Sequence, residues 1–321
     1  MTPTPNPEAT ATAIAKATAA RKATATARAK RRRRRTPTPA PLTGRIAFPV
    51  FNDGPGVYDV YIANIDGSNM QRLLHQASQP DFSPNGQMLA FRQWKSDERG
   101  IATINLDGSN YQRRTHYLED SSPRWSPDGG RVAFFTRREF DRQSRLYWYG
   151  VFGLEEVPLF NQGVNVFGEM PSWLPDGRIL YRATYPHIGL AVVNSDGSNI
   201  VILIDDTQAT APAASPDGKR IVYMSHKDGN WEIYAADSDG SNIVRLTNNG
   251  SNDGLPVWSP DGTRIAFVSD RSGQWAIWVM NPDGSGQQQL FALPGSIDGR
   301  VEGESPEVSR GWTEESISWT R

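Results

Sequence analysis

Two turn signals repeat in step along this chain and decide what it can fold into. The tripeptide Asp-Gly-Ser occurs five times, at intervals of 41, 89, 43 and 44 residues, with its aspartate at Asp66, Asp107, Asp196, Asp239 and Asp283. The double interval hides one degenerate copy. A second marker, Ser-Pro-Asp-Gly or a close variant, begins at Ser83, Ser126, Leu174, Ser215 and Ser259. Two turn signals locked at one period of about 43 residues indicate a supersecondary unit repeated about six times.

The copy at residues 254–291 shows what each unit contains. Ser259-Pro260-Asp261-Gly262 is typical of a tight turn, because proline presets φ at the first central position and glycine accepts positive φ. An apolar run precedes this turn, and three β-rich runs follow it at 264–268, 275–280 and 287–291. Asp283-Gly284 between the last two runs is a strong hairpin signal. Each unit is therefore predicted to form four antiparallel strands, named a to d in chain order.

These units are predicted to close into a ring. A four-stranded sheet cannot bury both of its faces alone, and radial stacking around an axis buries them while leaving only short edges. No part of residues 44–321 shows helical periodicity. The first copy begins one strand late, at Gly44, and the pattern of residues 316–320 matches that of 255–259. We therefore expect an all-β, six-bladed β-propeller of four-stranded antiparallel blades, whose C-terminal strand pairs into the first blade and closes the ring.

Residues 1–43 are different in composition from the predicted propeller domain at 44–321. They hold ten Lys and Arg against Glu8 alone, whereas the rest of the chain holds 24 basic and 34 acidic residues. With almost no bulky apolar residue, this Thr/Ala/Pro/Arg-rich segment is predicted to be a disordered linker or tail. Its basic run has three interpretations, namely a solvated linker, a contact with an anionic surface or nucleic-acid binding. The run is Arg31, Arg32, Arg33, Arg34 and Arg35. Nucleic acid is disfavoured, because no aromatic residue lies among the arginines to stack on bases.

The repeat resembles a known family. The succession Ser-Pro-Asp-Gly, Arg-Ile-Val-Tyr, Glu-Ile-Tyr, Asp-Gly-Ser and Arg-Leu-Thr, clearest over residues 215–247, is similar to the WD-like repeat of TolB-type propellers. The resemblance covers residues 44–321 and departs from the pattern at 149–154 and in a long polar insertion at 292–311. It implies a bacterial, periplasmic or cell-surface propeller that binds proteins, peptides or envelope components. The chain shows no apolar run of signal-peptide or membrane-span length, so a cytoplasmic location stays open.

The turn aspartates raise the question of a metal. Turns a–b and c–d of every blade lie on one face, here called the turn face, so nine turn aspartates ring it. Carboxylates are ligands for calcium, and residues 237–242 resemble the start of a calcium loop. The glycine of that stretch is at the fourth rather than the sixth position, however, and Asn248 stands where a glutamate is required. We therefore predict no cofactor and expect structural aspartates that accept backbone N–H groups.

The opposite face, here called the loop face, carries the b–c and d–a loops, which differ from blade to blade. Variable loops on a rigid scaffold often carry binding function, and Arg, Trp and Tyr are enriched at binding hot spots. The predicted binding residues are Trp94, Lys95, Arg99, Arg137, Arg138, Arg142, Tyr185, His187, His226, Trp231, Arg271 and Trp275. Two alternatives stay open. Trp231 and Trp275 also suit packing between blades, and the arginines of 137–142 also suit local pairing with Glu139 and Asp141.

Enzyme templates find little support. His75 and His116 occupy equivalent positions in adjacent d–a loops, but a metal site needs three or four ligands, so surface histidines are expected. Neither a Gly-X-Ser-X-Gly nucleophile elbow nor a phosphate-binding glycine loop occurs. The sequence thus predicts a monomeric, non-catalytic binding or scaffold propeller that recognises a protein, a peptide or an envelope glycan through its loop face. The alternatives are a carbohydrate-active propeller enzyme of lyase or hydrolase type and a display domain without a ligand.

Overall fold

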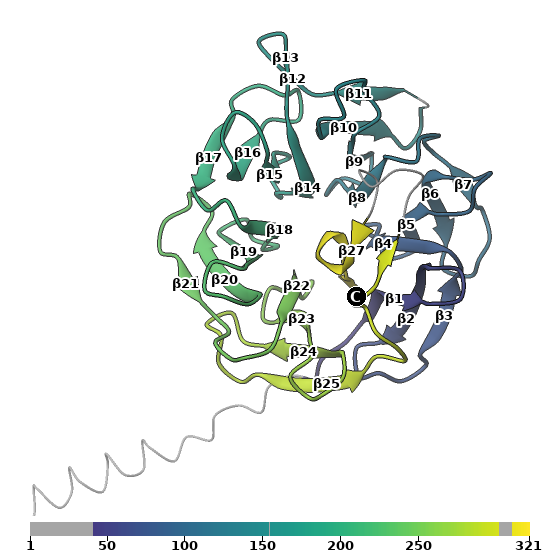
Figure 1. Cartoon of the computed structure of the whole chain (residues 1–321), viewed down its shortest axis with the longest axis vertical. Helices are drawn as coiled ribbons and strands as arrows, with labels where there is room; N and C mark the ends of the chain where they lie inside the picture. The colour runs from purple at the N-terminus through teal and green to yellow at the C-terminus, as the bar shows by residue number, and fades with distance from the viewer. Residues whose placement is uncertain (1–40, 154, 302–309) are drawn as a thin grey trace, which may run out of the picture. The chain divides into compact units, whose positions relative to one another are not determined.

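The computed structural model of the chain describes residues 41–153, 155–301 and 310–321. Six four-stranded antiparallel sheets, called blades 1 to 6 in chain order, surround a central axis (Figure 1). In blades 2 to 6 the innermost strand comes first in the sequence and the outermost comes last. The predicted six-bladed, all-β propeller is confirmed. The predicted tail lies outside the described residues apart from 41–43, and so does its run from Arg31 to Arg35.

The strands of each blade run in order from the axis to the rim. Blade 1 contains β28 (Ser318–Thr320), β1 (Arg45–Asn52), β2 (Val57–Asn64) and β3 (Gln71–Leu74). Blade 2 contains β4 (Ala77–Phe82), β5 (Met88–Gln93), β6 (Gly100–Asn105) and β7 (Gln112–Arg113). Blade 3 contains β8 (Ser121–Trp125), β9 (Arg131–Thr136), β10 (Arg145–Gly150) and β11 (Glu156–Pro158). Blade 4 contains β14 (Gly168–Trp173), β15 (Ile179–Ala183), β16 (Gly189–Val193) and β17 (Val201–Ile204). Blade 5 contains β18 (Ala209–Ala214), β19 (Arg220–Ser225), β20 (Glu232–Asp237) and β21 (Val244–Arg245). Blade 6 contains β22 (Asp253–Trp258), β23 (Ile265–Ser269), β24 (Ala276–Met280) and β25 (Gln288–Ala292).

Two additions interrupt this regular pattern. A hairpin of β12 (Phe160–Asn161) and β13 (Val164–Asn165), which the sequence did not predict, stands between blades 3 and 4. The polar insertion after β25 contains β26 (Arg300–Val301) and β27 (Arg310–Gly311), and residues 302–309 between them lie outside the described residues. The only helix in the described part of the chain is the 3-10 turn η2 (Trp312–Glu314).

The ring is closed by the predicted pairing of the last strand with the first. In the antiparallel register of β28 and β1, Ile46 lies opposite Trp319. Both side chains are buried, and the Trp319 Nε1–H donates to the Thr43 carbonyl oxygen at 3.1 Å. This closure pairs the inner edge of β1, which would otherwise be free to pair with another chain.

The turns form as their residue types require. In the a–b turn of blade 3, Asp128 Oδ1 accepts the Gly130 N–H at 3.0 Å, and Gly129 has a φ of +70°. In the c–d turn of blade 5, Asp239 Oδ1 accepts both the N–H and the hydroxyl of Ser241, at 2.9 and 2.6 Å. Backbone N–H groups are accepted in the same way at Asp66, Asp107, Asp128, Asp176, Asp196, Asp217, Asp239, Asp261 and Asp283. The predicted structural role of the turn aspartates is confirmed.

Apolar clusters fill the spaces between neighbouring blades. Between blades 3 and 4, for example, Phe135 and Leu146 pack with Tyr181 in one buried cluster. Similar clusters join blades 1 and 2, 2 and 3, 4 and 5, and 5 and 6. Blades 6 and 1 meet through the rings of Phe291 and Phe48, whose centroids are 5.9 Å apart. Each sheet therefore buries both faces, as the β-branched and aromatic strands require.

The inner strands of blades 2 to 6 share a β-bulge near the axis. In blade 2, for instance, the register with β5 shifts between Ser78 and Asp81. The residue inside the bulge has a positive φ in every case: Gln79, Ser122, Met170, Ala211 and Leu255, at 47° to 54°. The bulges also direct polar groups along the ring of inner strands, because the Ser122 N–H donates to Gln79 Oε1 at 2.8 Å. Five repeats of one irregularity mark it as a built feature of the propeller.

Candidate functional site

A pocket of about 260 Å³ lies between the inner strands, where these strands meet the a–b turns. We call it the axial pocket. Strands β8, β14, β18, β22 and β28 all contribute to it, so residues far apart in the sequence share one cavity. Its walls are mainly aromatic rings and turn prolines: Trp125, Trp173, Trp258, Trp319, Pro127, Pro216 and Pro260.

The wall contributed by blade 5 is made of small residues. Four other inner strands place an aromatic residue directly before the a–b turn, namely Phe82, Trp125, Trp173 or Trp258, and Trp319 has the equivalent position in β28, but blade 5 has Ala214 there. Ala211 and Ala213 of the same strand also line the pocket. Leu174 of blade 4 packs in the same cluster as Ala214. Blade 5 therefore contributes alanines to the pocket and no indole.

Charged groups lie at the inner end of the axial pocket. Asp81 Oδ2 accepts the Trp125 N–H at 2.8 Å, and Arg124 Nη1 donates to Ser316 Oγ at 3.1 Å. Burial raises the pKa of the Asp81 carboxyl and lowers the pKa of the Arg124 guanidinium, and each group opposes the shift of the other. The pocket therefore combines apolar walls with groups of both charge signs.

Two buried polar atoms of the pocket lining have no hydrogen-bond partner among the described residues. They are the acceptor Glu315 Oε1 and the donor Trp125 Nε1. The other oxygen, Glu315 Oε2, accepts the Gln79 N–H at 2.9 Å. Burial raises the pKa of Glu315 to about 8, although this N–H and the charge of Arg92 act in the opposite direction. Both unpaired atoms are covered by neighbouring protein atoms, so they lie within the wall of the pocket and not on its open surface.

A second cavity continues from the axial pocket along the turn face. This groove, of about 960 Å³, follows the a–b and c–d turns of blades 5 and 6. It shares Pro216, Trp258 and Pro260 with the axial pocket, so the two cavities are contiguous. We call it the turn-face groove.

Several predicted loop-face residues are held by internal contacts. Arg137 forms an ion pair with Glu169, which is 8% exposed, and Arg182 Nη1 lies 2.9 Å from the other oxygen of this carboxylate. Burial alone would raise the pKa of Glu169, but Arg137, Ser144 and Arg182 together lower it to about 2. Removing one partner of a buried pair costs about 3–5 kcal/mol, so Arg137 has a structural task.

The other two arginines of the 137–142 loop also pair outside that loop. Arg138 forms an ion pair with Glu156, and Arg142 Nη1 lies 2.8 Å from Glu119 Oε1. The structure therefore corrects the local pairing considered from the sequence, with Glu139 and Asp141. Those two carboxylates bond instead to Tyr147 and Arg145.

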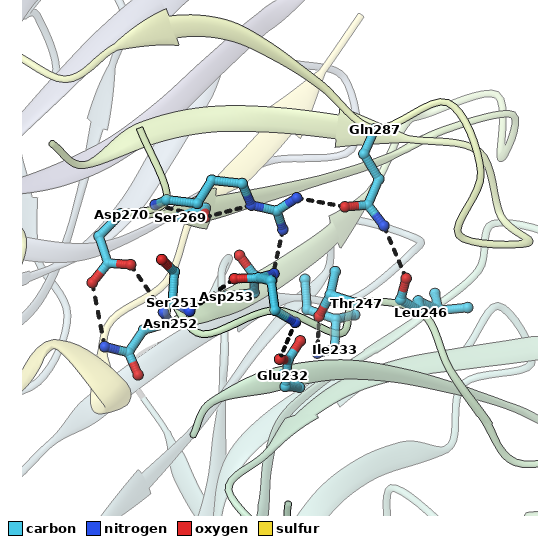
Figure 2. A network of polar contacts seen from close by, with 12 residues as sticks. Glu232, Ile233, Leu246, Thr247, Ser251, Asn252, Asp253, Ser269, Asp270 and Gln287 are labelled. Carbon is cyan, nitrogen blue, oxygen red and sulfur yellow. Dashed lines mark hydrogen bonds and ion pairs between the residues drawn. The ribbon is translucent and has the colours of Figure 1, made fainter. Parts of the chain in front are cut away.

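Arg271 belongs to a polar network between blades 5 and 6. Its Nη2 lies 2.6 Å from Oδ2 of the buried Asp253, and its Nη1 donates to Gln287 Oε1 at 2.6 Å. Figure 2 shows this network, in which Gln287 continues to the Leu246 carbonyl oxygen of the neighbouring blade at 2.9 Å. Arg271 thus joins two blades.

The three predicted tryptophans are also packed. Trp94 is 6% exposed and donates its Nε1–H to Ser78 Oγ at 2.9 Å. The rings of Trp231 and Trp275 contact the ring of Trp312 in η2, with centroids 6.1 and 5.1 Å apart. Both tryptophans are therefore packed, and their observed ring partner is Trp312, which follows the insertion, and not a residue of the neighbouring blade. The sequence did not reveal this partner, because η2 follows the irregular insertion.

The remaining predicted residues are more accessible. Lys95, Tyr185, His187 and His226 are exposed, and Arg99 is half-buried. They come from different blades, and they line neither the axial pocket nor the turn-face groove. Binding through the loop face thus stays a prediction that depends on a smaller set of side chains than the sequence indicated.

The structure does not gather the two histidines considered as metal ligands into a group that could hold a metal ion. His75 Nδ1 lies 3.6 Å from Asp59 Oδ1, and His116 is exposed. Among the described residues, no group of three or more His, Asp or Glu side chains is placed to hold a metal ion. In the same part of the chain, no helix has the length and apolar character needed to cross a bilayer.

The sequence matches known proteins over part of its length. Residues 170–301 match the family model described as the TolB beta propeller domain. The Tol-Pal system protein TolB of Francisella tularensis subsp. mediasiatica (strain FSC147) is 27% identical over 213 residues, which are 63% of this chain and 48% of the relative. The chain therefore spans about half the length of this relative.

Solved structures share the fold over most of the chain. TolB from Acinetobacter baumannii superposes with a TM-score of 0.70 at 18% identity, over 86% of this chain and 66% of that one. An oligogalacturonate lyase in complex with manganese superposes with a TM-score of 0.52 at 17% identity, over 83% and 78% of the two chains. At such identities the likeness concerns the fold alone. The matched segment at 170–301 and the observed ring thus make this chain a β-propeller that is similar to TolB.

Proposed function

We propose that this propeller is a non-catalytic binding module that recognises a polypeptide segment of a partner protein in the axial pocket. The observation that carries the proposal is a preformed pocket on the axis whose walls are tryptophan rings and prolines from several blades. An apolar side chain of a polypeptide segment fits such a cavity and contacts the tryptophan and proline walls.

The pocket walls are held in place before any ligand arrives. The Trp173 Nε1–H donates to the Arg124 carbonyl oxygen at 3.0 Å, and the Trp258 Nε1–H donates to the Ala213 carbonyl oxygen at 3.2 Å. Each of these bonds links neighbouring blades, so the indoles cannot turn independently. A rigid surface loses little conformational entropy on binding, which favours recognition by a preorganised site.

The family likeness supports the kind of partner and its location. The TolB relative is named as a protein of the Tol-Pal system, which supports a protein partner for this chain. The resemblance to TolB-type propellers supports action in the bacterial envelope as a monomer. In this proposal the exposed loop-face residues Lys95, Tyr185, His187 and His226 form a secondary contact surface.

The test adds a ring to the pocket wall. In Ala213→Phe the new side chain occupies part of the axial pocket, and in the matched control Ser272→Phe it stands on an exposed b–c loop of the loop face. Random octapeptides displayed on phage are selected on the wild-type propeller, and retention on each variant is measured. We expect the control to retain the selected peptides and Ala213→Phe to lose them, with both variants folded by circular dichroism. Retention by Ala213→Phe with loss by Ser272→Phe would show that binding occurs on the loop face.

A further inference from the structure

The turn-face groove gives a ligand in the axial pocket a path outward. Pro216, Trp258 and Pro260 line both cavities, so the groove adjoins the pocket at blades 5 and 6. The groove has the larger volume, about 960 Å³, which accommodates several residues of an extended chain. The chemistry of the groove therefore bears on the residues that flank an anchored side chain.

Two carboxylates of the groove each have a free oxygen. Asp239 uses Oδ1 for the N–H and hydroxyl of Ser241, and Asp261 uses Oδ1 for Ser259 Oγ–H and the Thr263 N–H. These hydrogen bonds lower the pKa of both carboxyls, so both are ionised at neutral pH. Their Oδ2 atoms accept no hydrogen bond from the described residues. Both side chains are exposed on the wall of the groove.

The cations that line the groove do not pair with these two carboxylates. Lys219 Nζ lies 3.8 Å from Asp217 Oδ2, and Arg220 Nη1 donates to the Pro282 carbonyl oxygen at 2.8 Å. Arg321 lines the groove as an exposed side chain. Among the described residues, Asp239 and Asp261 have no ion-pair partner. Two anionic acceptors without ion-pair partners on the wall of one groove favour a ligand with a basic side chain over one with an acidic side chain.

We propose that the partner segment carries a lysine or arginine beside its apolar anchor, and that this basic side chain lies in the turn-face groove against Asp239 and Asp261. This inference rests on the proposed function, because the anchor in the axial pocket directs the flanking residues into the groove. The other turn aspartates carry similar charges, but most of them line neither cavity. Asp217 also lines the groove but lies 3.8 Å from Lys219 Nζ, so position in the groove together with the lack of an ion-pair partner distinguishes Asp239 and Asp261.

The experiment compares two double variants that make the same chemical change. Asp239→Asn with Asp261→Asn alters the groove, whereas Asp66→Asn with Asp128→Asn alters one c–d and one a–b turn outside both cavities. Asparagine keeps the Oδ1 acceptor, so the turns are preserved. The probes are an octapeptide selected from the random library on the wild-type propeller and its counterpart with each Lys or Arg replaced by Ser. Affinity is measured by fluorescence anisotropy at low and moderate salt.

We expect the selected pool to be enriched in Lys or Arg on one side of an apolar residue. The groove variant is expected to bind the basic peptide about three- to tenfold more weakly and with a shallower salt dependence, because exposed ion pairs contribute modestly. The matched control variant binds like the wild type, and the serine peptide binds all three proteins equally.

The remaining outcomes separate this inference from the proposed function. Peptides that Ala213→Phe excludes, but that show no basic preference and bind the groove variant normally, would overturn the inference and leave the proposed function intact. Equal losses of affinity in the two double variants would overturn the inference as well. The basic peptide would then be attracted by the overall negative charge of the turn face and not by Asp239 and Asp261. A library that yields no peptide sensitive to Ala213→Phe would overturn both.

Discussion

At the scale of single residues, Asp120 is a buried carboxyl whose two oxygens accept no hydrogen bond from the described residues. Arg138 Nη1 lies 4.0 Å from Oδ2, and the same guanidinium pairs with Glu156. Burial raises the pKa of Asp120 to about 6, although the Arg138 charge opposes the shift. Because the folded-state pKa is above the unfolded value, the stability from this group is fully present at low pH and is lost as the pH rises through about 6.

Replacing this charge with a neutral group is expected to stabilise the protein at neutral pH. Asp120→Asn should raise the free energy of unfolding by about 1–3 kcal/mol at pH 7.5 and by about a third as much at pH 4.5. Urea unfolding at both pH values measures the effect. The control Asp128→Asn removes an exposed turn carboxylate whose pKa is lowered, so it should give no gain at pH 7.5. An Asp120→Asn effect that is the same at the two pH values would contradict the raised pKa of Asp120.

At the scale of elements, the inner-strand bulges are the feature that local sequence least explains. Ser122 has a φ of +53°, and its buried hydroxyl has no hydrogen-bond partner among the described residues. Glycine adopts positive φ without the steric cost of a side chain, which is about 1 kcal/mol. Ser122→Gly is therefore expected to raise the free energy of unfolding by about 1 kcal/mol in urea titrations. The control Ser121→Gly changes a neighbouring residue without a positive φ and should lower the free energy of unfolding by a similar amount. A lower free energy of unfolding in both variants would argue against strain in the bulge.

The turns and strands could be predicted because their signals are local. Pro-Asp-Gly and Asp-Gly-Ser sequences need only neighbouring atoms to form the bonds seen at Asp128 and Asp239. The bulges had no such signal, since the positive-φ residues are not glycines and the ring imposes their conformation. The same limit applies to the loop-face arginines. Glu169 is 32 residues from Arg137 and Asp253 is 18 residues from Arg271, so only the assembled blades bring these partners together.

The axial pocket was also beyond direct prediction, because six separate strands line it. One sequence signal did exist. Ala214 occupies the position that is aromatic in the other five inner strands, and Leu174 replaces the serine of the preceding a–b turn. Two departures from the repeat in adjacent blades, Ala214 and Leu174, indicate a local change of shape. Comparison of the repeats at that position would have pointed to blade 5.

At the scale of the whole molecule, ring closure concentrates stability in one short strand. Trp319 is 7% exposed, lies opposite Ile46 and donates to the Thr43 carbonyl oxygen. Trp319→Ala is expected to lower the free energy of unfolding by about 3–5 kcal/mol, because it removes the buried indole where β28 pairs with β1. Trp319→Phe keeps most of the ring volume and should lose much less. Chemical unfolding followed by circular dichroism, with size-exclusion chromatography of the folded proteins, measures both. A loss below about 1 kcal/mol for Trp319→Ala would mean that the other strands hold the ring without this contact.

The pairing of Ile46 with Trp319 also sets the order of events during biosynthesis. The ribosome makes β1 early, but β28, which completes the same sheet, is made only after residue 317. At about 5–20 residues per second, tens of seconds pass between the two. During that interval the nascent chain exposes an unpaired strand that newly made copies on the same messenger RNA can capture. We expect chaperone binding to the nascent chain, measured by ribosome profiling of chaperone-bound chains, to persist until β28 has been translated.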